Sequence, residues 1–182
     1  MIVKNNDSGN YEPLPTGLQN AICVNVFDCG LQRGAEIFGG KVQHKCVVLW
    51  ELEADNSEGQ HFTATKIYTA SLGEKANLRH DLESWRGQGF TEDELGGFEL
   101  DNIKSHQCTL NLVRKEKTNG KTYTEISAVL PVLKSAGKIE IQTSREYIPE
   151  FVKRMIENQL PAEKVEESPS KVDNHFDDDI PF

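Results

Sequence analysis

The fold class is decided by the stretch His44-Lys45-Cys46-Val47-Val48-Leu49-Trp50-Glu51-Leu52-Glu53. Its centre is apolar and contains adjacent valines, a composition that favours a β-strand. Turn-forming residues follow at 55–59, and residues 61–70 are again rich in threonine and aromatic side chains. We therefore expect two strands, at 44–53 and 61–70, that pair as a hairpin.

Another strand and a helix flank this hairpin. Upstream, residues 17–29 form a long apolar run that predicts an earlier strand. Downstream, Leu78, Leu82 and Trp85 recur at helical spacing within residues 74–86. The pattern predicts an amphipathic helix there.

A second hairpin is predicted further along the chain. Residues 107–117 and 121–132 are strand-like, and the Asn119-Gly120 dipeptide between them is a strong hairpin signal. The order is therefore three strands, a helix and two strands. It predicts a mainly β domain with helices, in which five strands form an OB-fold barrel. A β-grasp fold or another small α+β domain shares most of this order and stays open.

The composition changes at two points near the end of the chain. Residues 144–160 carry Tyr147, Phe151 and Met155 at helical spacing, which predicts a helix that docks on the domain formed by residues 1–143. Residues 161–182 contain three prolines, many charges and few apolar side chains. We expect them to form a disordered acidic tail.

The chain has 182 residues, of which 37% are hydrophobic, and this suits one soluble domain. No apolar run approaches the length of a membrane span and no secretory signal is evident, so we expect a cytoplasmic protein without a membrane partner. The four cysteines are expected to be reduced and buried. His44 with Cys46 and His106 with Cys108 could in principle bind zinc, but the usual spacing is absent, so no metal or cofactor is expected.

The net charge of −9 by itself disfavours nucleic-acid binding, because phosphate affinity comes largely from Lys and Arg. The distribution of this charge changes that conclusion. Residues 161–182 hold two lysines and seven acidic residues, so −5 of the charge belongs to the tail and −4 to the rest. A nearly balanced domain can still present a basic groove.

Single-strand binding requires aromatic faces for stacking and basic side chains along the backbone. Phe62, Lys66 and Tyr68 share one face of their strand, which we predict to be the binding face, and Lys45 adds a charge on the neighbouring strand. Trp50 alternates with apolar residues and is more typical of a core than of a stacking platform. For Tyr68 both roles stay open.

The loops add further basic residues before the second strand and around the second hairpin. Such a hairpin could clamp a DNA backbone. Alternatively, the lysines of an exposed hairpin can serve only to keep the protein soluble and to prevent the strands from pairing with another chain. The predicted single-stranded DNA contacts are Arg33, Lys41, Lys45, Trp50, Phe62, Lys66, Tyr68, Arg114, Lys115, Lys117, Lys121 and Tyr123.

The last residues, Asp177-Asp178-Asp179-Ile180-Pro181-Phe182, match the C-terminal tip of bacterial single-stranded DNA-binding proteins almost residue for residue. This resemblance implies that Phe182 and its carboxylate enter a pocket on a partner while the aspartates meet basic residues around it. The implied partners are replication, recombination and repair proteins, such as a polymerase, helicase, nuclease, primase or recombinase. One aromatic anchor with a charged rim suits weak, exchangeable docking.

The stretch from Tyr68 through Trp85-Arg86-Gly87 to Leu95 resembles single-stranded DNA-binding proteins carried by bacteriophages and prophages. That resemblance implies an OB fold and a role in phage replication or recombination in the cytoplasm of a bacterial host. Proteins of this type occur in different assemblies, so a homo-oligomer is possible.

We therefore expect a non-enzymatic protein that coats single-stranded DNA without sequence preference and recruits partners through its tail. The alternative is an adaptor or decoy that captures host repair or replication proteins through the tail without binding DNA. The sequence contains no glycine-rich phosphate loop or nucleophile motif, which disfavours a nuclease or annealing enzyme.

Overall fold

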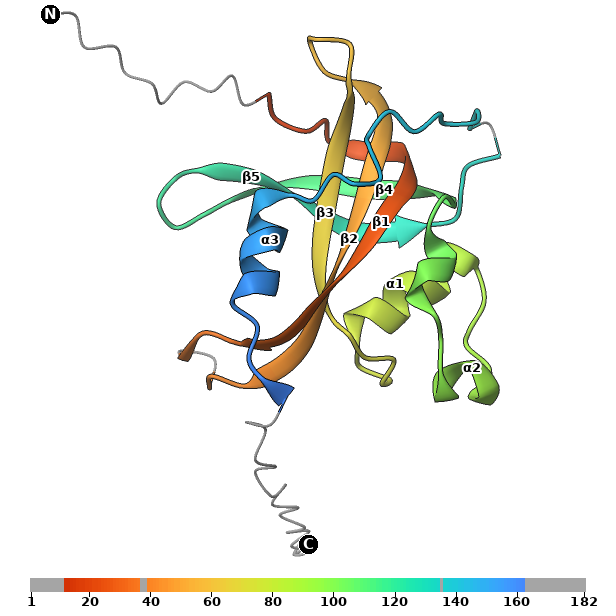
Figure 1. The fold of residues 1–182 in the computed structure, drawn as a ribbon. Helices are drawn as coiled ribbons and strands as arrows, with labels where there is room; N and C mark the ends of the chain where they lie inside the picture. The colour runs from red at the N-terminus through yellow and green to blue at the C-terminus, as the bar shows by residue number, and fades with distance from the viewer. Residues whose placement is uncertain (1–11, 37–38, 135, 163–182) are drawn as a thin grey trace, which may run out of the picture.

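The computed structural model describes residues 12–36, 39–134 and 136–162. Figure 1 shows a bent β-sheet with helices around it. Five antiparallel strands lie in the order β3-β2-β1-β4-β5. The elements along the chain are β1 (Gly17–Arg33), β2 (Val42–Asp55), β3 (His61–Thr69), α1 (Asn77–Arg86), α2 (Glu92–Gly96), a 3-10 turn (Leu100–Ile103), β4 (Gln107–Glu116), β5 (Thr122–Leu130) and α3 (Glu150–Glu157).

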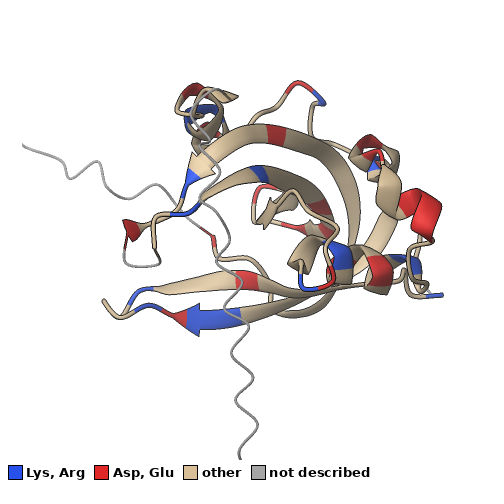
Figure 2. Ribbon diagram, turned by 90° about the horizontal axis from the view of Figure 1, so that it is seen from below, with Lys and Arg blue, Asp and Glu red and all other residues tan. Residues whose placement is uncertain are grey.

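The mainly β fold, the five strands and the helix after the third strand are confirmed. A closed barrel is not seen, because β3 and β5 stand at the two ends of the strand order and are not hydrogen-bonded to each other in the described chain. The sheet nevertheless curves strongly around its inner face (Figure 2). Helix α1 packs against both β3 and β5 and so lies across the gap between them.

The inner face of the sheet holds the main core. Alternating residues of β2 point into it, together with leucines of α1 and β4: Cys46, Val48, Trp50, Leu52, Leu78, Leu82, Leu110 and Leu112. Trp50 is 1% exposed, and its ring centroid lies 6.3 Å from that of Trp85 on α1. The interpretation of Trp50 as a core residue is confirmed. Its alternative use as a stacking platform is wrong for this conformation, because no face of the ring reaches solvent.

Strand β2 is buried on its outer face as well. Val47 and Leu49 pack there with side chains of β1 and with Val152 of α3, which is fully buried. The C-terminal helix therefore docks on the domain, as predicted. It spans Glu150–Glu157 rather than residues 144–160, because Pro149 disfavours helical backbone in the residue before it.

Between β5 and α3 the chain crosses the outside of the sheet, and we call residues 136–149 the strap. On β4, the Gln107 side chain donates to the Gly137 carbonyl at 2.7 Å and accepts from the Ile139 N–H at 3.3 Å. On β1, Asn25 donates to the Arg145 carbonyl at 3.2 Å. These contacts fix the strap across two neighbouring strands.

Across the ranges that the structure describes, no helix is long and apolar enough to cross a membrane. The predicted disordered tail lies outside the described residues from position 163 onward. The same holds for its acidic tip, Asp177 to Phe182.

Candidate nucleic-acid interface

Strands β4 and β5 form a long hairpin that projects from the sheet (Figure 1). Its turn is closed by the Lys117 N–H, which donates to the Lys121 carbonyl at 2.8 Å. Gly120 has a φ of +78°, in the left-handed region that glycine adopts without strain. The hairpin predicted from the Asn119-Gly120 dipeptide is therefore confirmed.

The hairpin brings together the predicted basic residues of this region, all of them exposed. Lys115 Nζ lies 2.7 Å from Glu125 Oε2, and this hydrogen bond and charge raise the pKa of Lys115. Lys117 Nζ lies 5.4 Å from the ring centroid of Tyr123, which is 38% exposed. Lys117 and Lys121 have no carboxylate partner among the residues described. The hairpin thus carries unneutralised positive charge beside an accessible aromatic ring.

Register divides these side chains between the two faces of the hairpin. Lys115 pairs with Tyr123 and Arg114 pairs with Thr124, so Lys115 and Arg114 leave the sheet on opposite sides. Arg114 Nη2 donates to the carbonyl of Leu14 at 3.0 Å. Arg114 therefore also anchors the segment before β1, and only part of its donor capacity is left for a ligand.

The predicted binding face of β3 is directed inward instead. Tyr68 is 3% exposed, and its hydroxyl donates to Asp81 on α1 at 2.7 Å. Lys66 Nζ meets the same carboxylate at 2.6 Å, and Phe62 is partly buried against the same core. Burial, followed by the charge of Asp81, raises the pKa of Tyr68.

The use of Tyr68 as a stacking ring is therefore wrong for this conformation, because the ring is buried. Lys66 is partly exposed and paired with Asp81, and its assignment as a DNA contact stays a prediction. Alternation along a strand shows which side chains share a face, but not which face is the core. Here the partner that turns this face inward is helix α1, which follows β3 in the chain.

The remaining predicted contacts lie near the loop between β1 and β2. Arg33 ends β1 and Lys41 precedes β2, and both are exposed. This loop projects on the same side of the molecule as the β4–β5 hairpin (Figures 1 and 2). Lys45 lies on β2, where its Nζ donates to Gln43 Oε1 and Thr69 Oγ1, both at 2.8 Å. Arg33, Lys41 and Lys45 stay predictions.

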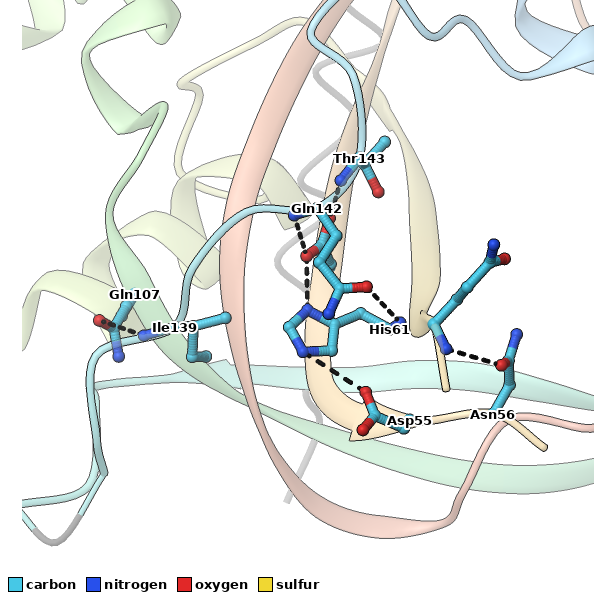
Figure 3. A network of polar contacts seen from close by, with 9 residues as sticks. Asp55, Asn56, His61, Gln107, Ile139, Gln142 and Thr143 are labelled. Atoms are coloured by element: carbon cyan, nitrogen blue, oxygen red, sulfur yellow. Dashed lines mark hydrogen bonds and ion pairs between the residues drawn. The ribbon is translucent and has the colours of Figure 1, made fainter. Parts of the chain in front are cut away.

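A network of polar contacts joins the strap to the start of β3, at His61 and Gln142 (Figure 3). Glu51 is 0% exposed and accepts the backbone N–H groups of Gln142 and Thr143 in the strap at 2.8 and 2.7 Å. His61 Nδ1 lies 2.6 Å from Glu51, and His61 Nε2 lies 3.5 Å from Asp55. Burial by itself raises the pKa of Glu51, but the hydrogen bonds from the strap and from His61 outweigh it and hold this pKa below its usual value.

Sequence reasoning missed this network, because its contacts to the strap join residues about 80 to 90 positions apart. A glutamate within an apolar strand was the one available signal, since a charged residue is rarely buried without partners. Helix α3 and the strap therefore cover the outer face of β2 around Val47, Leu49 and Glu51.

All four cysteines are free and buried, as predicted. Burial raises the pKa of Cys46 to about 11 and that of Cys23 to about 12, so these thiols stay protonated at neutral pH. His44 contacts Asp28 at 2.6 Å. In the described parts of the chain, no group of three or more His, Cys, Asp or Glu side chains is arranged to hold a metal.

No protein-family model matches the chain, and no curated protein compared with it matches either. Function therefore has to be argued from the hairpin, from the strand order and from the sequence of the tail.

Proposed function

We propose that this protein is a non-enzymatic, sequence-independent single-stranded DNA-binding protein with an OB-type domain. It coats DNA during phage replication or recombination in the bacterial host cytoplasm. The observation that carries this proposal is the β4–β5 hairpin, where Lys117, which has no carboxylate partner among the described residues, lies beside the 38% exposed ring of Tyr123. Stacking on an aromatic ring together with cations along the backbone is the combination that sequence-independent single-strand binding requires.

The strand order supports the OB assignment. In this fold β1 pairs with both β2 and β4, a helix joins β3 to β4, and the loops β1–β2 and β4–β5 flank the nucleic acid. The sheet has this pairing and this helix, with α1 across the gap where a closed barrel would join β3 to β5. In this proposal Arg33 and Lys41, which are both exposed, extend the basic surface from the β1–β2 loop.

The tail supplies the second half of the proposal. Its acidic tip, with Ile180 and Phe182 as apolar anchors, recruits replication, recombination and repair proteins. Removal of Phe182 is expected to abolish partner binding and leave DNA affinity unchanged or raised. Pull-down of a polymerase, helicase or nuclease from the host tests this, and equal capture with and without Phe182 contradicts it.

Fluorescence polarisation with labelled oligonucleotides tests the DNA-binding half. We expect salt-sensitive binding to single strands and much weaker binding to duplex. The double variant Lys117→Glu/Lys121→Glu should lose most of this affinity. Lys138→Glu/Lys153→Glu makes the same change of net charge at exposed sites away from the hairpin and is the matched control.

The alternative, an adaptor that binds protein through its tail without binding DNA, is favoured by two observations. Two of the aromatic rings expected to stack, Trp50 and Tyr68, are buried, and the outer face of β1–β2 is covered by α3. If no single strand binds at low salt while the tail still captures its partners, the adaptor is the correct function.

A further inference from the structure

A cleft of about 830 Å³ opens at the turn between β2 and β3. Its walls come from residues 12–14, from the turn and first residues of β3, and from the strap. This volume falls within the range of about 300–1,000 Å³ that is usual for ligand sites. The cleft shares no lining residue with the β4–β5 hairpin.

The chemistry of the cleft differs from that of the hairpin. Leu14, Phe62 and Tyr147 give it apolar surface, and Tyr147 is 47% exposed. Glu12 and Glu58 add two carboxylates. None of the described residues that line the cleft is Lys or Arg.

One of the two carboxylates, Glu12, is held in place by a hydrogen bond to the turn. Glu12 Oε2 accepts the Ser57 N–H at 2.8 Å, and this bond holds the pKa of Glu12 below its usual value. Among the described residues that line the cleft, His61 is the only one with a basic side chain, and its two ring nitrogens face Glu51 and Asp55. A phosphate backbone entering here would meet carboxylates without a compensating cation.

We infer that this cleft docks a segment of a partner protein in which an arginine or lysine lies next to an apolar side chain. The cationic group pairs with Glu12 and Glu58, and the face of Tyr147 is available for a cation–π contact. The apolar side chain packs against Leu14 and Phe62. This surface goes beyond the proposed DNA binding. It gives the folded domain a protein contact of the same charge sign as the acidic tail and of opposite sign to the basic β4–β5 hairpin.

The test uses the full chain and a labelled Arg-Phe-Arg amide peptide, with Glu-Phe-Glu amide as the control peptide. The basic peptide should bind and the acidic peptide should not. In Glu12→Gln/Glu58→Gln the affinity should fall by about tenfold, because two charges that attract the ligand are removed while the shape is kept. Tyr147→Ala should weaken binding of the basic peptide several-fold, because it removes one cation–π contact.

Glu92→Gln/Glu157→Gln changes two exposed carboxylates outside both the cleft and the hairpin and is the matched control. It should change peptide affinity less than about twofold, since surface charges outside the contact contribute little. The inference is overturned by equal affinity for both peptides, by unchanged affinity in the cleft variants, or by no binding of the basic peptide at millimolar concentration. Competition by a single-stranded oligonucleotide would also overturn it, because the cleft would then belong to the DNA interface. DNA binding measured on the same samples reports separately on the proposed function.

Discussion

Two lysine–tyrosine pairs in this protein have nearly the same geometry but opposite surroundings. Lys66 Nζ lies 5.3 Å from the ring centroid of Tyr68, and Lys117 Nζ lies 5.4 Å from that of Tyr123. Tyr68 is 3% exposed, and Asp81 contacts both members of its pair. Tyr123 is 38% exposed, and among the described residues no carboxylate contacts Lys117. The same residue types thus hold the fold together at β3 and are free to meet a ligand at the hairpin.

The difference lies in a third residue and in the element that carries it. Helix α1 brings Asp81 over the β3 pair, which neutralises Lys66 and gives the Tyr68 hydroxyl an acceptor. The tip of the β4–β5 hairpin extends beyond the main core, and among the described residues no helix brings a carboxylate to Lys117 there. Substitutions at the two pairs should therefore act on different properties.

The largest expected effect is on stability at β3. Tyr68→Ala removes a buried aromatic side chain and should lower the free energy of unfolding by about 3–5 kcal/mol. Tyr123→Ala should change it by less than about 0.5 kcal/mol, as is usual for surface sites. Urea denaturation of both variants measures the contrast, and similar losses in the two would remove the distinction.

The substitution Asp81→Ala should cause the next largest loss of stability. It leaves Lys66 and the Tyr68 hydroxyl without their shared acceptor, which should cost about 1–3 kcal/mol of stability. Affinity for single-stranded DNA should stay within about twofold of the wild type, since α1 lies outside the proposed contact. A loss of DNA affinity without a loss of stability would place the interface on β3 after all.

At the hairpin, Tyr123→Ala should weaken single-stranded DNA binding by about 1–3 kcal/mol, the range measured for one stacked base. Tyr123→Phe keeps the aromatic face and should bind almost as well as the wild type. Polarisation titrations at one salt concentration compare the three proteins. Equal affinity in Tyr123→Ala and the wild type would show that this ring does not stack.

The smallest effect is spectroscopic. Burial and the charge of Asp81 raise the pKa of Tyr68 in the folded protein. As the pH rises, the Tyr68 hydroxyl therefore loses its proton at a lower pH in the unfolded chain than in the folded one. The stability contributed by Tyr68 is then fully present below its unfolded pKa of about 10 and declines as the pH rises above it. An alkaline absorbance titration of folded Tyr68→Phe should match that of the wild type, because Tyr68 does not ionise before unfolding. A missing tyrosine step in this variant would contradict the burial.

Local patterns predicted much of the fold. The strands were predicted from apolar, β-branched and threonine-rich runs, and the helix after β3 from helical periodicity. The second hairpin was predicted from a dipeptide with a defined backbone requirement. The error concerned which side of β3 is buried, because that depends on where α1 returns in space. The hairpin could be predicted since its charges, its turn and Tyr123 are neighbours in sequence.

The rest depended on contacts between distant parts of the chain. The burial of β2 on both faces requires α3, and the ionised state of Glu51 requires backbone donors from the strap. The acidic cleft combines residues near positions 12, 60 and 145. No local pattern in the sequence brings these segments together.

The central claim is that single-stranded DNA contacts the β4–β5 hairpin rather than β3. Photo-crosslinking of an oligonucleotide carrying 4-thiothymidine, followed by peptide mapping, measures this contact directly. We predict that the dominant crosslinked peptide contains residues 117–123 and that it is lost in Lys117→Glu/Lys121→Glu. Crosslinks confined to residues 61–69, or none under conditions where DNA is bound, would contradict the claim.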